Sequence, residues 1–223
     1  MKTGIRGTVI SLMAASAAFA GCSTLDVASP SLQSAYRPDN VYSFERRLPV
    51  EMRRVAVMPL TCDDQQTALV SGRDALGSVL IAELMKTRKF EVVTVRPDDL
   101  RRLTGKDRWS GEELLPAGML DSLRENYGCD AVLFGRLTDF RAYAPLAVGW
   151  RLKLVDAHSG YTIWAGDELF DAGKPGVMAA VRHYREKQIK TGNAAEGDWA
   201  FLNSPRRFGQ YAVAQMFDTL PAR

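Results

Sequence analysis

The sequence predicts a single α/β domain: a βαβαβ unit, then an antiparallel hairpin, forming a mixed sheet with helices packed on it. Short apolar runs alternate with helical patterns over residues 54–140, and crossover helices require parallel neighbouring strands. The run over 131–134 is continuously apolar, as in strands that are buried on both faces. Residues 150–164 instead alternate apolar and charged side chains around a turn, which indicates a hairpin.

The first half of the domain contains two expected strands and a long helix. Residues 54–60 form a short apolar run that ends near Pro59, which is typical of a strand. A helix is expected over 67–88, where leucines recur at spacings of four and seven and cationic residues at the end complement the helix dipole. Residues 90–95 are the second expected strand, and Pro97 follows it closely.

Two further helices are expected before the third strand, over 98–105 and 112–127, and that strand covers 131–140. In the hairpin, apolar residues alternate with Arg151 and Lys153, so one face of these strands should be wetter than the other. Trp164 is expected to pack the sheet onto a helix.

The C-terminal part of the domain is expected to hold two helices and a loop. Pro175 begins a helix, residues 191–203 read as a loop, and Ser204 caps a last helix that begins at Pro205.

The first 21 residues have the order of a secretory signal. Lys2 and Arg6 are followed by an uncharged stretch over 7–20. At 1.5 Å per residue, such a stretch covers roughly 21 Å as a helix, which is too short for a hydrocarbon core of about 30 Å. We therefore expect a signal peptide over 1–21 rather than a permanent membrane span.

The end of this segment, Phe19-Ala20-Gly21-Cys22, resembles the bacterial lipoprotein signal: an apolar residue, two small residues and a cysteine. The resemblance implies that Cys22 is the lipid attachment site, with a diacylglyceryl group on its sulfur, and that its amino group is acylated, for example with palmitate, after cleavage. Ser23 then implies the outer membrane. The alternative is a plain secretory signal with a coincidental cysteine.

Removing residues 1–21, which carry two basic and no acidic side chains, leaves 202 residues with a formal charge of +1. This gives no electrostatic reason to expect a nucleic-acid partner. Residues 22–49 hold three prolines among polar residues without a sustained period, and we expect a lipidated, flexible tether of roughly 30 Å reach. The alternative for its second half is that the sequence around Val41, Tyr42 and Phe44 packs onto the domain, which covers 50–223.

Two cysteines remain besides Cys22. Cys62 follows the first strand, whereas Cys129 precedes the third. If these strands are parallel, the two thiols lie at opposite ends of the sheet, roughly 20 Å apart, and a disulfide needs Cα atoms within about 7 Å. We expect two separate thiols.

Residues 53–171 carry a pattern of a strand ending near proline, a Gly-x-Asp-Ala turn before a strand with glycine, and a Val-Asp-x-x-Ser-Gly hairpin leading to tryptophan. This pattern is similar to that of envelope lipoproteins related to the curli secretion protein, the penicillin-binding-protein activators and a neisserial surface-lipoprotein group. The resemblance implies a small α/β fold and non-enzymatic roles in envelope assembly, secretion or partner activation. The matching positions are Pro59, Gly128, Asp130, Ala131, Gly135, Val155, Asp156, Ser159, Gly160 and Trp164.

No catalytic, cofactor-binding or metal-binding set is recognisable. His158 lies in the hairpin turn, His183 lies among cationic residues of a helix, and no Walker loop, nucleophile elbow or HExxH motif is present. Asp63 and Asp64 follow the first strand, where open sheets hold ligands; the alternative is a polar loop that opens the next helix. Residues 182–190 are either a solvated helix face or a contact for anionic lipid or glycan.

We therefore expect a non-enzymatic, cofactor-free accessory protein, lipid-anchored in the bacterial outer membrane with its domain facing the periplasm. It would act by contact with an envelope protein partner in assembly, secretion or activation, with homo-oligomerisation as a second kind of contact. The alternative is a periplasmic module that binds a small ligand or glycan near Asp63 and Asp64.

Overall fold

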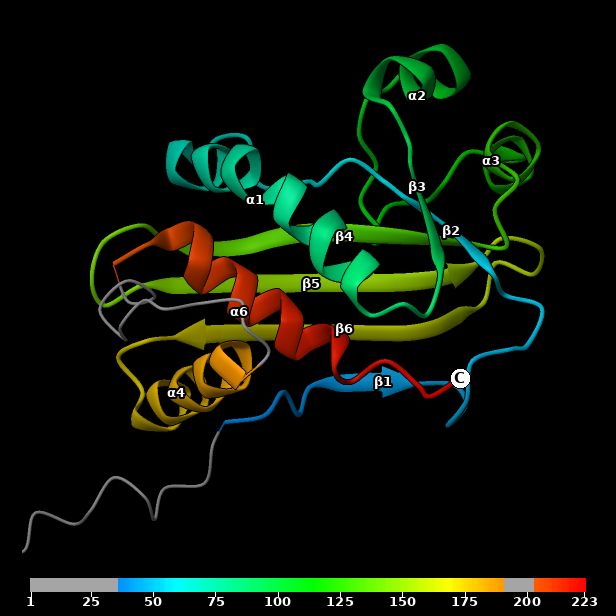
Figure 1. Ribbon diagram of the computed structural model, residues 1–223. Coiled ribbons are helices and arrows are strands. Elements are labelled where there is room, and N and C mark those ends of the chain that lie inside the picture. The colour runs from blue at the N-terminus through cyan, green and yellow to red at the C-terminus, as the bar shows by residue number, and fades with distance from the viewer. Residues whose placement is uncertain (1–35, 191–202) are drawn as a thin grey trace, which may run out of the picture. The chain divides into compact units, whose positions relative to one another are not determined.

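A computed structural model describes residues 36–190 and 203–223 (Figure 1). Its strands are β1 (Val41–Ser43), β2 (Arg54–Val57), β3 (Glu91–Thr94), β4 (Ala131–Arg141), β5 (Ala147–Asp156) and β6 (Thr162–Asp171). They form one mixed sheet in the order β1-β6-β5-β4-β2-β3. β2 pairs in parallel with both β3 and β4, whereas β4, β5, β6 and β1 pair in antiparallel fashion. The predicted mixed α/β sheet is confirmed.

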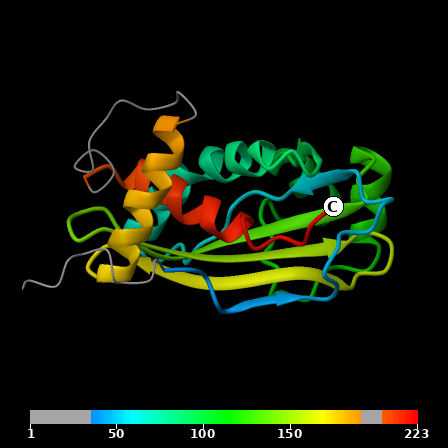
Figure 2. The same cartoon turned by 60° about the horizontal axis from the view of Figure 1, so that its bottom comes forward.

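Five helices in the described residues pack on this sheet: α1 (Thr67–Lys86), α2 (Pro97–Thr104), α3 (Met119–Tyr127), α4 (Pro175–Lys190) and α6 (Pro205–Phe217). α1, α4 and α6 cover one face of the sheet, as Figure 2 shows. α2 and α3 contact the opposite face near β2 and the first half of β4. The expected Ser204 cap is confirmed, because its side chain accepts a hydrogen bond from the Arg207 N–H.

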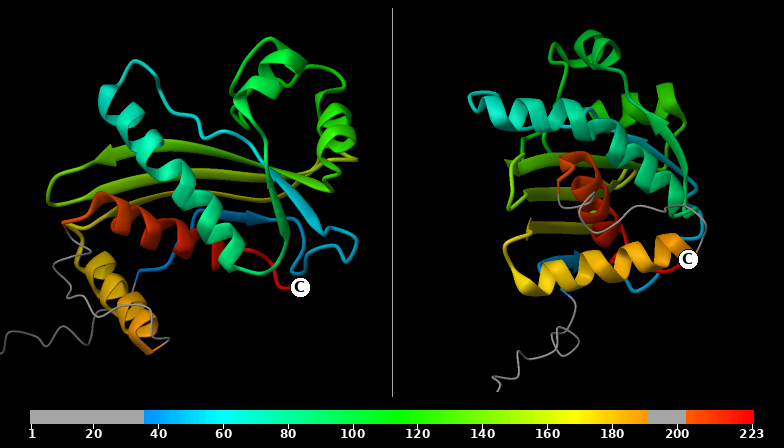
Figure 3. Two further views of the ribbon diagram at one scale, coloured as in Figure 1. Left: turned by 45° about the horizontal axis from the view of Figure 1, so that its top comes forward. Right: turned by 60° about the vertical axis from the view of Figure 1, so that its left-hand side comes forward.

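Alternation along β2 and β4 explains the two cores. Val55 and Val57 belong to the large core under α1 and α6, whereas Ala56 and Met58 belong to a smaller core under α2 and α3. β5 and β6 have helices on only one face, because α2 and α3 do not extend across them (Figure 3). The other face of β5 and β6 therefore stays open, as the charged residues of the hairpin predict.

Close helix contacts depend on glycine. A Cβ at Gly209 of α6 would lie 2.5 Å from a Leu76 methyl carbon of α1, and a Cβ at Gly72 would lie 2.5 Å from the Phe140 ring. The register of β4 and β5 shifts between Leu137 and Asp139, so that Leu137 and Phe140 both contact α1 at Gly72. Larger side chains at these glycines would push the helices off the sheet and off each other.

The prediction of a helix over 112–127 is wrong in its first half, because α3 begins only at Met119. Pro116 lacks a backbone N–H, and Gly118 has a φ of 75°, in the left-handed region. Residues 111–118 therefore form two turns joined by an irregular stretch. β2 is also shorter than expected and ends at Val57. The loop expected over 191–203 falls almost wholly outside the described residues.

Residues 36–48, called here the N-terminal strap, contact the domain along the β6 edge. Tyr36 donates its hydroxyl proton to Glu168, and its backbone N–H donates to the Gly176 carbonyl at 3.0 Å. β1 then pairs with β6, and the Leu48 N–H donates to the Ala222 carbonyl at 2.8 Å. Of the two alternatives for the second half of the expected tether, the structure has the packed one; residues 22–35 lie outside the described residues.

Cys62 and Cys129 are both free, as predicted. The parallel pairing of β2 with β4 places Cys62 beyond the end of one strand and Cys129 before the start of the other. Cys129 is buried, and Cys62 is partly exposed.

Candidate functional site

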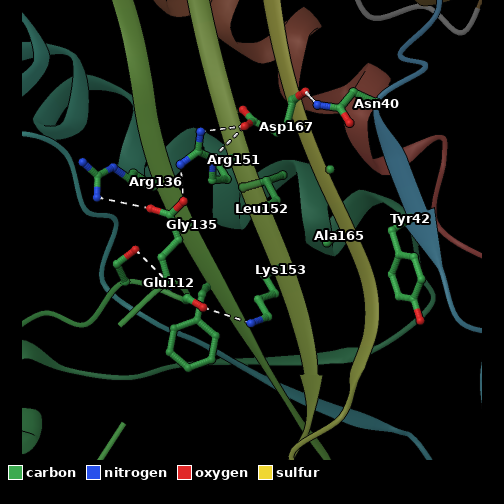
Figure 4. Close-up of a pocket in the computed structure, with 14 residues that line it drawn as sticks. Asn40, Tyr42, Glu112, Gly135, Arg136, Arg151, Leu152, Lys153, Ala165 and Asp167 are labelled. Atoms are coloured by element: carbon green, nitrogen blue, oxygen red, sulfur yellow. Dashed lines mark hydrogen bonds and ion pairs between the residues drawn. The ribbon is translucent and has the colours of Figure 1, made fainter. Parts of the chain in front are cut away.

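The open face of the sheet contains a pocket of about 510 Å³ over β4, β5 and β6. We call it the sheet-face pocket. Three strands supply its floor, β1 supplies one wall, and the turn between α2 and α3 supplies the other (Figure 4). Its charged side chains and its half-exposed aromatic ring are those of Tyr42, Glu112, Arg136, Arg151, Lys153 and Asp167.

A row of charged residues crosses this floor. Arg136 of β4 is paired in register with Arg151 of β5, and Arg151 is paired with Asp167 of β6. The Arg151 Nε and Nη2 atoms lie 2.7 and 2.6 Å from one carboxylate oxygen of Asp167. This hydrogen bond raises the pKa of Arg151 above its already high ordinary value, so the guanidinium stays charged.

Two arginines directly opposite each other on neighbouring strands repel, and such pairs destabilise a sheet unless an anion lies between them. Glu112 supplies this anion. One of its carboxylate oxygens accepts a hydrogen bond from Arg151, and the other lies 3.4 Å from Nη1 of Arg136 (Figure 4). The result is a chain of alternating charge from Arg136 through Glu112 and Arg151 to Asp167.

A tight turn holds Glu112 over the sheet. The Ser110 N–H donates to the Glu113 carboxylate at 3.0 Å, and the Glu113 N–H donates to the Ser110 carbonyl at 3.2 Å. Gly111 lies so near the sheet that a Cβ would be 3.1 Å from Cβ of Phe134. Lys153 then donates to the Gly111 carbonyl at 3.0 Å. Glycine at this position lets the turn approach closely enough for Glu112 to reach both arginines.

The opposite wall is the N-terminal strap. Tyr42 is 51% exposed and lines the pocket, and the Asn40 side-chain amide donates to the Asp167 carbonyl at 2.9 Å. The pocket therefore combines cationic and anionic side chains with one half-exposed aromatic ring and a side-chain amide.

Asp63 and Asp64 do not line the sheet-face pocket. Asp63 accepts hydrogen bonds from the Gln66 side chain at 2.9 Å and the Gln65 N–H at 3.1 Å, and these bonds hold its pKa below the ordinary value. Asp64 pairs with Arg73 at 2.5 Å. Both carboxylates thus hold the loop that leads into α1. Within residues 36–190 and 203–223, no group of three His, Cys, Asp or Glu side chains could bind a metal ion.

The two histidines lie on different elements. His158 is in the turn between β5 and β6, where its Nδ1 lies 3.4 Å from Nη1 of Arg124, and His183 is exposed on α4. Neither lines the sheet-face pocket. The basic segment 182–190 is the second half of α4, with Arg182 exposed and Tyr184 buried against the core. Cys22 lies outside the described residues.

The sequence pattern indicated part of this pocket. The alternation of Arg151 and Lys153 predicts the wet face on which both lie. A charge at Arg136, inside a strand expected to be buried on both faces, was a further signal. Glu112 was missed, because the sequence around it predicts a helix instead of a turn.

No protein-family model matches the sequence, and no curated protein matches it. Several solved structures are similar at low identity. The PelC dodecamer from Paraburkholderia phytofirmans is 13% identical, with 84% of this chain and 96% of that chain covered and a TM-score of 0.46. Lipoprotein GNA1162 from Neisseria meningitidis is 17% identical, with 63% of this chain and 99% of that chain covered and a TM-score of 0.40. Escherichia coli LpoB is 14% identical, with 73% of this chain and 82% of that chain covered and a TM-score of 0.37. A neisserial lipoprotein is thus among the similar structures.

Proposed function

We propose that this protein is a lipid-anchored accessory of the bacterial outer membrane, whose domain faces the periplasm and acts by contact with another envelope protein. The observation that carries the proposal is Phe19-Ala20-Gly21-Cys22 directly after a charged and then apolar N-terminal segment. A single acyl chain binds membranes only marginally, and several chains make a stable anchor. Among the residues that the structure describes, no helix is long and apolar enough to span a membrane.

A binding role rather than a catalytic one is part of this proposal. The charged groups of the sheet-face pocket are Arg, Lys, Glu and Asp side chains that pair with one another. General acid–base and nucleophilic catalysis need a group placed to exchange a proton with the substrate. Ion-paired side chains on an open sheet face are better suited to recognising a complementary surface.

Substitution of the acceptor cysteine tests the anchor. Cys22→Ala should abolish metabolic labelling with a fatty acid and move the protein from the membrane to the soluble fraction. Cys62→Ala is the matched control and should change neither. Membrane retention of Cys22→Ala with unchanged labelling would contradict the lipoprotein proposal.

The anchor's reach can be tested without disturbing the domain. Deleting residues 26–35 keeps Cys22–Leu25 and also keeps the N-terminal strap, whose bonds to the domain begin at Tyr36. The melting curve should stay nearly unchanged, because no described residue is removed. Rescue of a strain that lacks the gene should be lost, since the reach of a flexible chain grows with the square root of its length. Full rescue by the shortened protein would count against a partner that must be reached from the membrane.

Crosslinking in intact cells tests for the partner. A photoreactive residue at Phe44, which is 66% exposed on the N-terminal strap and does not line the sheet-face pocket, should yield one dominant protein adduct. Leu103, exposed on α2, is the matched control position, and adducts there should be weaker. Equal and diffuse labelling from both positions would contradict a specific protein contact through the strap.

A further inference from the structure

We propose that the sheet-face pocket binds a saccharide that carries carboxylate groups, and that a ligand carboxylate takes the place of Glu112 between Arg136 and Arg151. This inference goes beyond the proposed accessory function and does not depend on the lipid anchor. It also assigns a position to the ligand-binding alternative, away from Asp63 and Asp64.

Two arginines on neighbouring strands create a site for an anion. Arg136 and Arg151 are register partners on neighbouring strands, so their guanidinium groups share one region of the sheet face. Arg151 is engaged on both sides, by Asp167 and by Glu112. In the described part of the chain, Arg136 has one hydrogen bond, to Glu112 at 3.4 Å, so most of its N–H donors stay available. Planar guanidinium groups bind carboxylates well because two donors match two acceptor oxygens.

The Glu112 side chain can move away from the arginines without unfolding the turn that carries it. The bonds that close the turn come from Glu113, which accepts from the Ser110 N–H and from Lys106. The Glu112 backbone N–H donates to the Ser110 hydroxyl at 3.4 Å, a bond that does not involve its carboxylate. The Glu112 side chain contacts only the arginines and is 44% exposed. Asp167 differs, since it lies within β6 and its backbone is part of the ladder. Glu112 is therefore the carboxylate that a ligand can displace at low cost.

Displacement of Glu112 makes the net charge of the pocket more positive. With Glu112 in place, three cationic side chains face two carboxylates. With Glu112 moved out, the cations Arg136, Arg151 and Lys153 keep Asp167 as the one carboxylate that lines the pocket. Asp63 and Glu113, which do not line the pocket, offset part of the charge of Arg136. The emptied position therefore attracts an anion, and the attraction is weakened by salt because the pocket is open to solvent.

The shape of the pocket favours a saccharide. Its volume of about 510 Å³ lies within the range of small-molecule sites and exceeds what one carboxylate side chain would fill. Tyr42 offers a half-exposed ring on which the apolar face of a sugar ring can pack. Asn40 adds an exposed side-chain amide at the rim for sugar hydroxyl groups. A simple acid would leave these groups unused, whereas a neutral sugar could not replace Glu112.

Calorimetry on the purified mature protein in detergent, at low salt, tests the inference. The probe is trigalacturonic acid, and the comparison ligands are maltotriose and a hexapeptide of aspartate. We expect binding of the acidic sugar alone. Glu112→Gln should bind it at least threefold more tightly, because the internal competitor is neutralised, and Arg151→Gln should bind it at least tenfold more weakly. Arg136→Gln should also weaken binding, and it makes fewer contacts within the fold, so it serves if Arg151→Gln does not fold.

The matched controls are Glu125→Gln on the exposed face of α3 and Arg102→Gln on α2, which pairs with Asp99. Both should bind the acidic sugar as the unmodified protein does. Three outcomes would overturn the inference: no binding of the acidic sugar, tighter binding of the aspartate peptide than of the sugar, or unchanged affinity in the arginine variants. A lower affinity in Glu112→Gln would also overturn it, because Glu112 would then be part of the binding surface.

Discussion

The indole N–H of Trp164 donates a hydrogen bond to the Thr219 hydroxyl at 3.1 Å. This bond joins the beginning of β6 to the turn after α6. Thr219 in turn donates to the Met216 carbonyl at 2.6 Å, and the Trp164 ring contacts Phe217 with ring centroids 6.3 Å apart. Trp164 is fully buried, and the prediction that it packs the sheet onto a helix is confirmed.

Truncation of this side chain should destabilise the domain strongly. Trp164→Ala removes a large buried ring and leaves the Thr219 hydroxyl without its donor, and changes of this kind cost about 3 to 5 kcal/mol. Chemical denaturation followed by circular dichroism measures the free energy of unfolding. Tyr161→Ala, at a position that is 74% exposed in the same hairpin, is the control and should change it little. Similar effects of the two substitutions would contradict the packing described for Trp164.

Two glycines of α1 should respond in opposite ways to alanine. At Gly72 a Cβ would lie 2.5 Å from Cγ of Phe140 and 2.7 Å from Cδ2 of Leu137, so Gly72→Ala should destabilise by about 1 to 3 kcal/mol. A Cβ at Gly77 would meet no atom of another element within 4 Å, and Gly77→Ala should stabilise by about 0.5 to 1 kcal/mol through helix propensity. Denaturation midpoints measure both. The same sign for both changes would mean that α1 does not approach β4 as closely as described.

Acid should weaken the junction between β6 and α4. The Gly173 N–H, at 2.8 Å, and the Arg141 guanidinium hold the pKa of Asp171 below its ordinary value. A carboxylate with a lowered pKa stabilises the folded state above its unfolded pKa, and this contribution is lost as pH falls through the folded pKa. Asp171→Asn should therefore cost up to about 1 kcal/mol at neutral pH, since the side chain is partly exposed, and progressively less below about pH 4. A difference between the two proteins that stays constant from pH 7 to pH 3 would disagree with this explanation.

The two thiols of the domain should react at different rates. Burial raises the pKa of Cys129, which is 1% exposed, and burial also raises the pKa of Cys62, where nearby Arg73 partly offsets it. In native Cys22→Ala protein, a thiol reagent should modify Cys62 first, because Cys129 must wait for local opening. Peptide mapping should find no bridge between them before reduction. A quantitative bridge would contradict the parallel pairing of β2 with β4.

The fold class followed from periodicity because burial dictates it directly. The sequence of β4 is continuously apolar where helices cover both faces of the sheet. The sequence of β5 alternates apolar and charged residues where helices cover one face only. β1 was harder to predict. It pairs through only three residues, and its Tyr42 side chain is half exposed, so neither length nor burial gives a strong pattern. Its position is determined by pairing with β6, about 120 residues later in the sequence, which periodicity does not report.

The sheet-face pocket shows a similar limit. Arg151 and Lys153 could be assigned to one face because a strand repeats every two residues. Glu112 could not be joined to them, since Glu112-Glu113-Leu114-Leu115 resembles the start of an amphipathic helix. Pro116 and Gly118 decide against that helix, and the close approach allowed by Gly111 then brings Glu112 to arginines that are 24 and 39 residues away in the sequence.

The N-terminal strap also determines how the domain would respond to mechanical load. A pull applied from the N-terminal side reaches Tyr36 first, then the Glu168 contacts of Asp39 and Asn40, then β1, and last the bond between Leu48 and Ala222. Because β1 is an edge strand that pairs only with β6, release of the strap leaves the pairing among the other five strands unchanged. Each released residue adds about 3.3 to 3.6 Å of chain, so the thirteen residues of the strap store roughly 45 Å of slack. With the lipid anchor proposed at Cys22, release of the strap would let the domain lie that much farther from the membrane, and renewed pairing of β1 with β6 would draw it back.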